Sequence, residues 1–213
     1  MDVFGPSWEN HAETIKRNWD AQVLDSDLVL VAGDTSWAMR LNDAMPDLAY
    51  LGERPGRKIV VRGNHDYWWK REATRRLQSV VDPSITLLQG QAAVFDGVGI
   101  TGTRGWAEDA EGGSEEQNRR ILERELRYLE AGLTALPEDL KLRIVVLHFP
   151  PYSASLEPNA FLDLAREHSV GIIVYGHLHL PMSERRLEGD VDGVRLHLAA
   201  VDSVGFGPSL IVP

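Results

Sequence analysis

Four short polar clusters, each closing a run of aliphatic residues, constrain this chain more than any other feature of its sequence. The clusters are Gly33-Asp34, Gly63-Asn64-His65-Asp66, His148 and Gly176-His177-Leu178-His179, and the aliphatic runs before them are residues 28–31, 59–61, 144–147 and 172–174. Parallel strands of α/β domains bind their ligands at the carboxyl ends of the strands. The pattern therefore predicts buried strands whose ends gather carboxylate, amide and imidazole groups at one edge.

These side-chain types predict a metal site, and their number suits two neighbouring metal ions. The chain has no cysteine, which excludes thiolate metal sites, disulfides and a cysteine nucleophile. Imidazole mixed with carboxylate and amide oxygen favours Mn²⁺, Fe or Zn²⁺, and the abundance of histidine disfavours Ca²⁺ or Mg²⁺ alone. The sequence holds no Gly-x-Ser-x-Gly elbow, Walker A loop or dinucleotide fingerprint.

Each signal also has an ordinary structural explanation. Taken alone, Asp34 fits a turn aspartate and His148 fits a hydrogen-bonded core histidine. The Gly-Asn-His-Asp string closes a Val-Val-Arg strand, which favours a functional role for it. His177 and His179 follow a glycine and can both point into one site only in a tight turn or at a strand end. The remaining histidines, interpreted as surface or packing residues, are His11, His168 and His197.

Composition fits one globular domain spanning residues 1–213. The chain is 43% hydrophobic and 25% charged, and its net charge of −10 disfavours general binding to nucleic acid or to a membrane surface. No apolar stretch approaches the ~20 residues that span a bilayer. The first eight residues lack the pattern of a signal peptide, so we expect a cytoplasmic protein.

Hydrophobic periodicity predicts early βα units followed by segments rich in strands, which suggests two packed sheets flanked by helices. Strands are expected at residues 27–32, 58–62, 85–88, 92–95, 98–101, 142–148 and 171–175, with a late hairpin pairing 182–187 with 194–200. Helices are expected after a Ser7 cap, at 41–51, at 67–80, from a Ser114 cap to about 133, and at 158–168.

The clusters, in this order, resemble the calcineurin-like metallophosphoesterases over about residues 27–179. Residues 33–40, 62–69 and 102–106 are similar to an uncharacterised bacterial branch. The resemblance implies an α/β fold, a four-layer αββα sandwich of two mixed β-sheets flanked by helices. It also implies an enzyme that hydrolyses a phosphomonoester or phosphodiester with a metal-bound hydroxide at a dinuclear site.

The resemblance also implies roles for single residues. Asp34 would bridge two divalent metal ions, and His179 would bind the first of them. The second metal would be completed by Asn64, His148 and His177. His65 would face the scissile phosphate and protonate the leaving oxygen or stabilise the transition state.

Other residues near the clusters have two open interpretations. Arg40, Arg62 and Arg104 could hold phosphate oxygens or be ordinary surface arginines. Trp37, Trp68 and Trp69 could wall a pocket, although core packing is expected for at least one of them.

Two departures from the family pattern stand out. An Asp-x-His at the end of a first strand has no counterpart before Asp34, and Trp37 occupies the position of an acidic partner of the catalytic histidine. Asp66 is one candidate for that partner. Either the natural protein begins upstream with the missing first strand, or the chain has lost one metal. We favour the first explanation, which implies an unpaired sheet edge and exposed apolar surface.

A rival interpretation is a non-catalytic scaffold of the same fold with an impaired metal site. Retention of His65 argues against it, because a scaffold has little need of a leaving-group acid. The sequence does not indicate the substrate, the metal or the oligomeric state.

Overall fold

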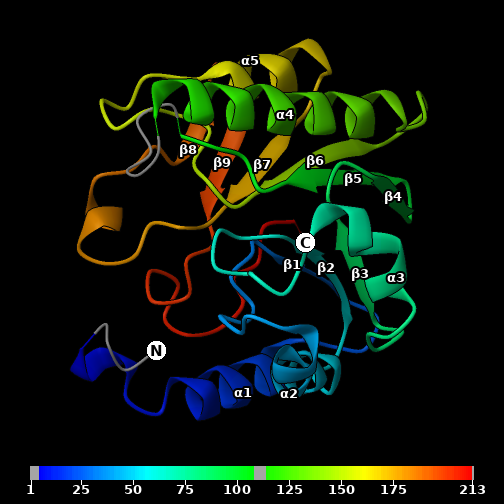
Figure 1. The fold of residues 1–213 in the computed structure, drawn as a ribbon, viewed down its shortest axis with the longest axis vertical. Helices are drawn as coiled ribbons and strands as arrows, with labels where there is room; N and C mark the ends of the chain where they lie inside the picture. Colours follow the sequence, from blue (N-terminus) through cyan, green and yellow to red (C-terminus); the bar gives the residue numbers. More distant parts are fainter. Residues whose placement is uncertain (1–4, 108–113, 213) are drawn as a thin grey trace.

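Two β-sheets pack face to face, with helices on both outer sides (Figure 1). The structure, a computed structural model, describes residues 5–107 and 114–212. Through the layers the order is α1 and α2, the smaller sheet, the larger sheet, and then α4 and α5. The predicted four-layer αββα architecture is confirmed.

The strands are β1 (Leu28–Val31), β2 (Arg57–Val61), β3 (Ile85–Leu88), β4 (Ala92–Phe95), β5 (Val98–Thr103), β6 (Leu142–Leu147), β7 (Ile172–Tyr175), β8 (Gly189–Val191) and β9 (Val194–Leu198). The α-helices are α1 (His11–Gln22), α2 (Leu41–Gly52), α3 (Thr74–Gln78), α4 (Glu115–Thr134) and α5 (Ala160–Glu167). Among the described residues, no helix is both long and apolar enough to cross a membrane.

The smaller sheet has the order β1-β2-β3. Its described strands are all parallel, so the expectation of two mixed sheets holds only for the larger sheet. Helices α2 and α3 connect its strands, and α1 leads into β1. One face of the sheet packs on α1, α2 and α3 through residues such as Trp19, Leu48 and Leu77. The other face carries Ile59 and Val61 into the core between the sheets. Because successive side chains of a strand point to opposite faces, each strand of this sheet contributes both to the core under the helices and to the core between the sheets.

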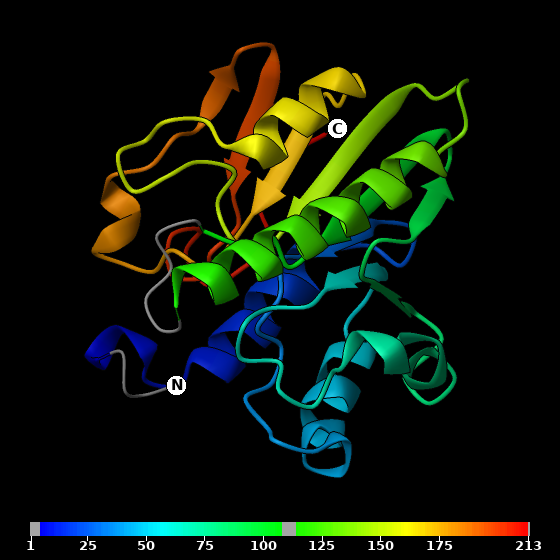
Figure 2. The same cartoon turned by 45° about the horizontal axis from the view of Figure 1, so that its top comes forward.

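The larger sheet has the order β4-β5-β6-β7-β9-β8 and is mixed. Its centre is parallel, and antiparallel hairpins form both edges. Helices α4 and α5 lie across its outer face (Figure 2) and bury Leu129, Leu133 and Phe161 there. As predicted, Ser114 caps α4, in a capping box with Gln117.

Three local predictions need correction. The helix expected at 67–80 forms only over Thr74–Gln78, because the indoles of Trp68 and Trp69 are buried and bonded to Asp66 and Thr74. The late hairpin uses residues 189–191 instead of 182–187, since Asp192-Gly193 adopts the two positive φ angles of a tight hairpin turn. Helix α1 begins at His11 instead of being capped by Ser7.

Candidate active site

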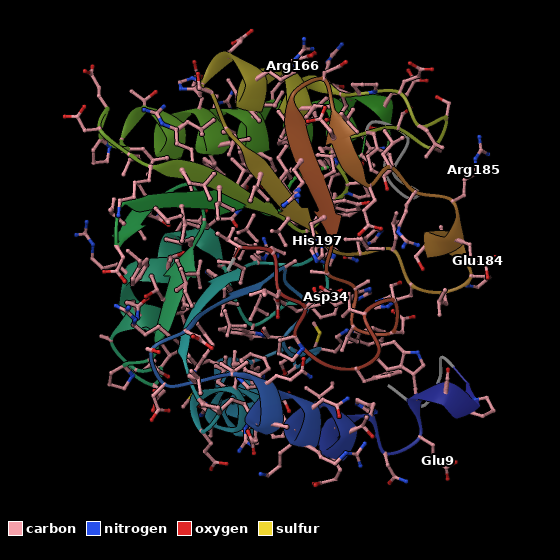
Figure 3. All side chains as sticks on the ribbon, turned by 180° about the vertical axis from the view of Figure 1, so that it is seen from behind. Glu9, Asp34, Arg166, Glu184, Arg185 and His197 are labelled. Atoms are coloured by element: carbon pink, nitrogen blue, oxygen red, sulfur yellow. The ribbon has the colours of Figure 1, made fainter. Side chains whose placement is uncertain are left out.

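The ends of four strands bring polar side chains together at the seam between the two sheets. Asp34 follows β1 and Asn64 follows β2 in the smaller sheet, whereas His148 follows β6 and His177 follows β7 in the larger one. Figure 3 labels Asp34 in the middle of the molecule, beside the C-terminal segment drawn in red. The site therefore depends on the packing of both sheets.

His148 is the centre of this cluster and is only 2% exposed. Its Nε2 atom lies 2.5 Å from Asn64 Oδ1, 3.1 Å from His177 Nδ1 and 3.5 Å from Asp34 Oδ2. Its other ring nitrogen, Nδ1, lies 2.8 Å from the carbonyl oxygen of Ala32. A carbonyl can only accept a hydrogen bond, so Nδ1 carries the proton and neutral His148 turns a lone pair toward the cluster.

Protonation of His148 at Nε2 is unfavourable at neutral pH. Burial lowers the pKa of His148 to about 4, and burial together with the charge of His148 lowers the pKa of His177 to about 4. At neutral pH the His148 lone pair thus faces two acceptor oxygens, of Asn64 and Asp34. A cation among these atoms would turn an unfavourable contact into coordination. Within residues 5–107 and 114–212, however, no three His, Asp or Glu side chains are arranged to hold a metal ion by themselves.

Backbone conformation at the cluster is strained. Asp34 and His177 are non-glycine residues with φ of 57° and 69°, in the left-handed region where such residues are uncommon. The turn after β2 also approaches Asp34 closely, because a Cβ atom on Gly63 would lie 2.0 Å from Asp34 Oδ1. Only glycine fits at position 63, because the turn after β2 packs directly against the Asp34 side chain in the turn after β1.

His65 lies beside the cluster and is held on three sides. Its backbone N–H donates to Asp34 Oδ1 at 2.9 Å, and its Nδ1 lies 2.9 Å from the Tyr67 hydroxyl. The ring stacks on Trp37 with centroids 4.2 Å apart and planes 23° from parallel. Among the described residues no hydrogen-bond partner occupies Nε2, which leaves this nitrogen available to a bound molecule.

Among the described residues Asp66 makes no hydrogen bond to the ring of His65, so the structure does not support this candidate as partner of that histidine. It is fully buried and ties the two turns together instead. Oδ2 accepts from the backbone N–H of Asp34 and Gly63, and Oδ1 accepts from the Ser36 N–H, the Thr35 hydroxyl and the Trp68 indole. The partner that sequence reasoning missed is Tyr67, two residues after His65.

A family model for calcineurin-like phosphoesterases matches residues 6–181 of this chain, which is most of its length. The chain belongs to the calcineurin-like phosphoesterase family. The family is typified by hydrolases that bind divalent metals and act on phosphate esters.

Two further comparisons found similar proteins. The chain is 36% identical over 58 residues to the Gene 66 protein of Mycobacterium phage L5, a match that spans 27% of the chain and 28% of that relative. The crystal structure of TT1561 of Thermus thermophilus superposes with a TM-score of 0.57 at 14% identity, covering 91% of this chain and 84% of the other. At that identity the likeness concerns the fold.

His179, which follows the same strand end as His177, has a buried carboxylate partner of its own. Its Nδ1 lies 2.9 Å from Asp202 Oδ1, and the Asp202 side chain is only 3% exposed. Asp202 also accepts from the Leu180 N–H. A carboxylate on one ring nitrogen directs the other nitrogen outward, as it does for many metal-binding histidines. Asp202 was missed from the sequence, although it too follows a strand, β9.

The three predicted phosphate-binding arginines differ in their surroundings. Arg40 is exposed at the start of α2. Arg62 Nε donates to the Asp66 carbonyl at 3.4 Å, and burial lowers the pKa of Arg62. Arg104 is 8% exposed and lies 3.6 Å from Glu125, and its Nε and Nη2 have no hydrogen-bond acceptor among the described residues. Burial lowers the pKa of Arg104 to about 10, still high enough to keep its charge at neutral pH.

We expect the metal-free protein to lose stability as pH falls from about 7 toward 4. The pKa of His148 and of His177 is about 4 in the folded state, against 6.5 in the unfolded chain, so only the unfolded chain gains protons over this window. One such histidine contributes about 3 kcal/mol of destabilisation across it. Burial raises the pKa of Asp34. The folded chain therefore binds this proton before the unfolded chain does, which partly offsets the loss of stability near pH 4.

Urea unfolding at several pH values, in chelator-treated buffer, measures this slope. His148→Gln should flatten it, because one of the two low-pKa histidines is gone. A free energy of unfolding that stays constant between pH 7 and 5 would contradict the expectation.

Proposed function

We propose that this chain is a metal-dependent phosphoesterase that hydrolyses a phosphomonoester or a phosphodiester. The observation that carries the proposal is the unprotonated Nε2 of His148 facing the oxygens of Asn64 and Asp34, with His177 beside them. This arrangement suits a cation. His65, whose Nε2 has no hydrogen-bond partner in the described part of the chain, lies next to it.

The residues present fit one metal ion. Metal–ligand distances of about 2.0–2.2 Å place neighbouring ligand atoms roughly 3 Å apart. The separations of 3.1 Å and 3.5 Å around His148 agree with this, whereas the 2.5 Å between His148 Nε2 and Asn64 Oδ1 would have to widen. Asp34, Asn64, His148 and His177 would hold that ion. Asp34 and His179, the latter oriented by Asp202, would contribute to a neighbouring one, for which the described residues supply a partial ligand set. The donor set suits Mn²⁺, Fe or Zn²⁺.

The chemistry supplied by divalent ions in such a site is polarisation of phosphoryl oxygens and activation of water at neutral pH. The protein's own residues would do the rest. His65 would donate a proton from Nε2 to the leaving oxygen, while Trp37 and Tyr67 hold its ring. Arg104, whose Nε and Nη2 have no hydrogen-bond acceptor among the described residues although Nη2 is ion-paired with Glu125, would attract an anionic oxygen of the substrate.

Hydrolysis of p-nitrophenyl phosphate and bis-p-nitrophenyl phosphate, with and without added Mn²⁺ or Zn²⁺, tests the proposal. Calorimetric titration with each metal measures binding independently of turnover. We expect binding that His148→Gln weakens, and hydrolysis that a chelator abolishes. Metal binding without hydrolysis of either ester would favour the scaffold interpretation, and absence of metal binding would remove the metal site.

Replacing Tyr67 by phenylalanine should slow esters with poor leaving groups more than activated ones. The Tyr67 hydroxyl fixes the ring of His65 through Nδ1, and Trp37 stacking alone leaves the ring free to turn in its plane. We expect roughly a tenfold lower kcat for phenyl phosphate, less than the 10²–10⁴ of general acid catalysis, because the acid itself remains. The kcat for p-nitrophenyl phosphate, whose leaving group needs less protonation, should change little. Equal losses on both esters would contradict a positioning role for Tyr67.

A further inference from the structure

The guanidinium of Arg104 follows β5, and the residue is only 8% exposed. Its Nε and Nη2 atoms are buried and have no hydrogen-bond acceptor among the described residues. These two nitrogens form one edge of the planar guanidinium, and such an edge binds two oxygens of a carboxylate or phosphate group side by side. Burying donors without acceptors costs free energy, so this edge of Arg104 is suited to an oxyanion.

Glu125 of α4, the carboxylate paired with Arg104, is already bonded to other donors. Its Oε2 accepts from Gln89 Nε2 at 2.8 Å and from the Thr103 hydroxyl. Its Oε1 lies 3.2 Å from Arg124 Nη2. Arg104 Nη2 is 3.6 Å from the same oxygen, which is an ion pair beyond hydrogen-bond distance. Glu125 therefore attracts Arg104 but does not satisfy the N–H groups on this edge.

The negative charge of Glu125 is also shared among three arginines. It acts on Arg62, Arg104 and Arg124. Arg62 has Asp66 as a second acidic neighbour, whereas the acid that opposes the charge of Arg104 is Glu125. A carboxylate shared by several cations neutralises none of them fully, so an anion beside Arg104 would supply negative charge that this region needs.

Unsatisfied polar atoms gather at this position. In residues 5–107 and 114–212, four buried side-chain nitrogen and oxygen atoms have no hydrogen-bond partner, namely Arg104 Nε and Nη2, Trp106 Nε1 and Gln89 Oε1. The guanidinium of Arg104 lies over the Trp106 ring, with Cζ 4.6 Å from the centroid, and Gln89 shares Glu125 with Arg104. Native proteins leave few buried polar groups unpaired. Three donors and one acceptor suit a phosphate group, whose oxygens accept and whose singly protonated form also donates.

This position lies beside the metal-binding cluster, and Phe149 lies between them in the chain of contacts. The Arg104 carbonyl accepts from the N–H of His148 at 3.1 Å and from that of Phe149 at 2.9 Å. The Phe149 ring centroid is 5.1 Å from that of Trp106 and 4.2 Å from that of His177. A molecule that reaches both positions therefore needs two groups, an ester phosphate at the cluster and a second anion at Arg104.

We propose that Arg104 and Trp106 form a subsite for a second phosphate group of the substrate, one that is not hydrolysed. The substrate of this chain is then a phosphate ester that carries another phosphate. Arg104 donates to two oxygens of that group through Nε and Nη2, and Trp106 Nε1 donates to a third. The identity of the substrate rests on the proposed function, whereas binding of the anion itself needs neither metal nor turnover.

Calorimetric titration of the chelator-treated full chain with inorganic phosphate tests the subsite. We expect binding that Arg104→Met weakens by at least about tenfold, because charge-assisted hydrogen bonds are lost. Trp106→Phe keeps the ring and removes one donor, so it should weaken binding by roughly threefold to tenfold. Arg120→Gln removes an exposed arginine of α4 and is a matched control that should keep the affinity. Urea unfolding of each variant shows whether the fold persists, and Trp106→Phe carries the test if Arg104→Met does not fold.

Bisphosphates of linear alkanediols of increasing length, compared with their monophosphates, test the substrate class. With added Mn²⁺ we expect at least one bisphosphate to have a KM about tenfold or more below that of its monophosphate, as one added ionic contact gives. Arg104→Met should abolish this advantage and Arg120→Gln should keep it. A carboxylate in place of the second phosphate should gain less, because it has two oxygens for three donors.

Two results would overturn the subsite. One is a chelator-treated chain that binds no phosphate, and the other is phosphate binding that folded Arg104→Met and Trp106→Phe variants retain in full. Hydrolysis with equal KM for bisphosphates and monophosphates would overturn the second phosphate group and leave the proposed function in place. Phosphate binding that depends on Arg104, without hydrolysis of any ester, would support the anion subsite and remove the proposed function instead.

Discussion

His65→Ala is expected to lower kcat for phenyl phosphate by about 10²–10⁴, the range of general acid catalysis. The alanine removes a ring whose Nε2 has no hydrogen-bond partner among the described residues, while the backbone N–H of residue 65 can still donate to Asp34 Oδ1. The carboxylate of Asp34 therefore keeps its position. Loss should be smaller for p-nitrophenyl phosphate, because its leaving group departs with less help from an acid.

The specificity of this effect can be measured. His168→Ala, at the end of α5 and outside the cluster, is a matched control that should retain kcat. Metal affinity, measured by calorimetry, should be unchanged in His65→Ala. Equal losses on both esters, or loss of metal binding, would show that residue 65 supports the site rather than donating a proton.

Asp66→Ala is expected to lower the free energy of unfolding by about 3–5 kcal/mol, as removal of one partner from a buried charged network does. The Asp66 carboxylate accepts five hydrogen bonds, from Asp34, Thr35, Ser36, Gly63 and Trp68. The substitution leaves these donors without an acceptor in a fully buried position. The turns that present Asp34 and Asn64 then lose their common anchor, so metal affinity should fall as well.

Urea unfolding measures this loss against two reference variants. Asp139→Ala removes an exposed carboxylate and should change stability by less than about 0.5 kcal/mol. Asp66→Asn keeps the shape of the side chain but places its NH₂ group against the surrounding N–H and O–H donors, so this variant should also unfold more easily. If Asp66→Ala unfolded at the same urea concentration as Asp139→Ala, the network would have no structural importance.

The parts of the site that follow strands were predictable from the sequence. Asp34, Asn64, His148 and His177 meet because parallel strands deliver their carboxyl ends to one edge, and an aliphatic run followed by a polar residue shows where each strand ends. The same rule could have found Asp202 after β9. It was overlooked because one aspartate in an Ala-Ala-Val-Asp-Ser string has no motif around it.

Contacts that depend on side-chain packing were not predictable. Nothing in the sequence distinguishes Asp66 from Tyr67 as the neighbour of His65, because the choice depends on which way the turn after β2 directs each side chain. The burial of Trp68 and Trp69 likewise replaced an expected helix by an irregular segment, since two indoles and their hydrogen bonds outweigh helical propensity there.

The hydrogen bond from His148 Nδ1 to the Ala32 carbonyl joins the larger sheet to the smaller one across 116 residues of sequence. A molecule that binds both His148 and Asp34 therefore connects the two layers, and its binding free energy adds to the resistance of the whole domain to melting. Thermal-shift screening of metals and phosphorylated compounds can thus rank ligands of this site before any turnover is detected.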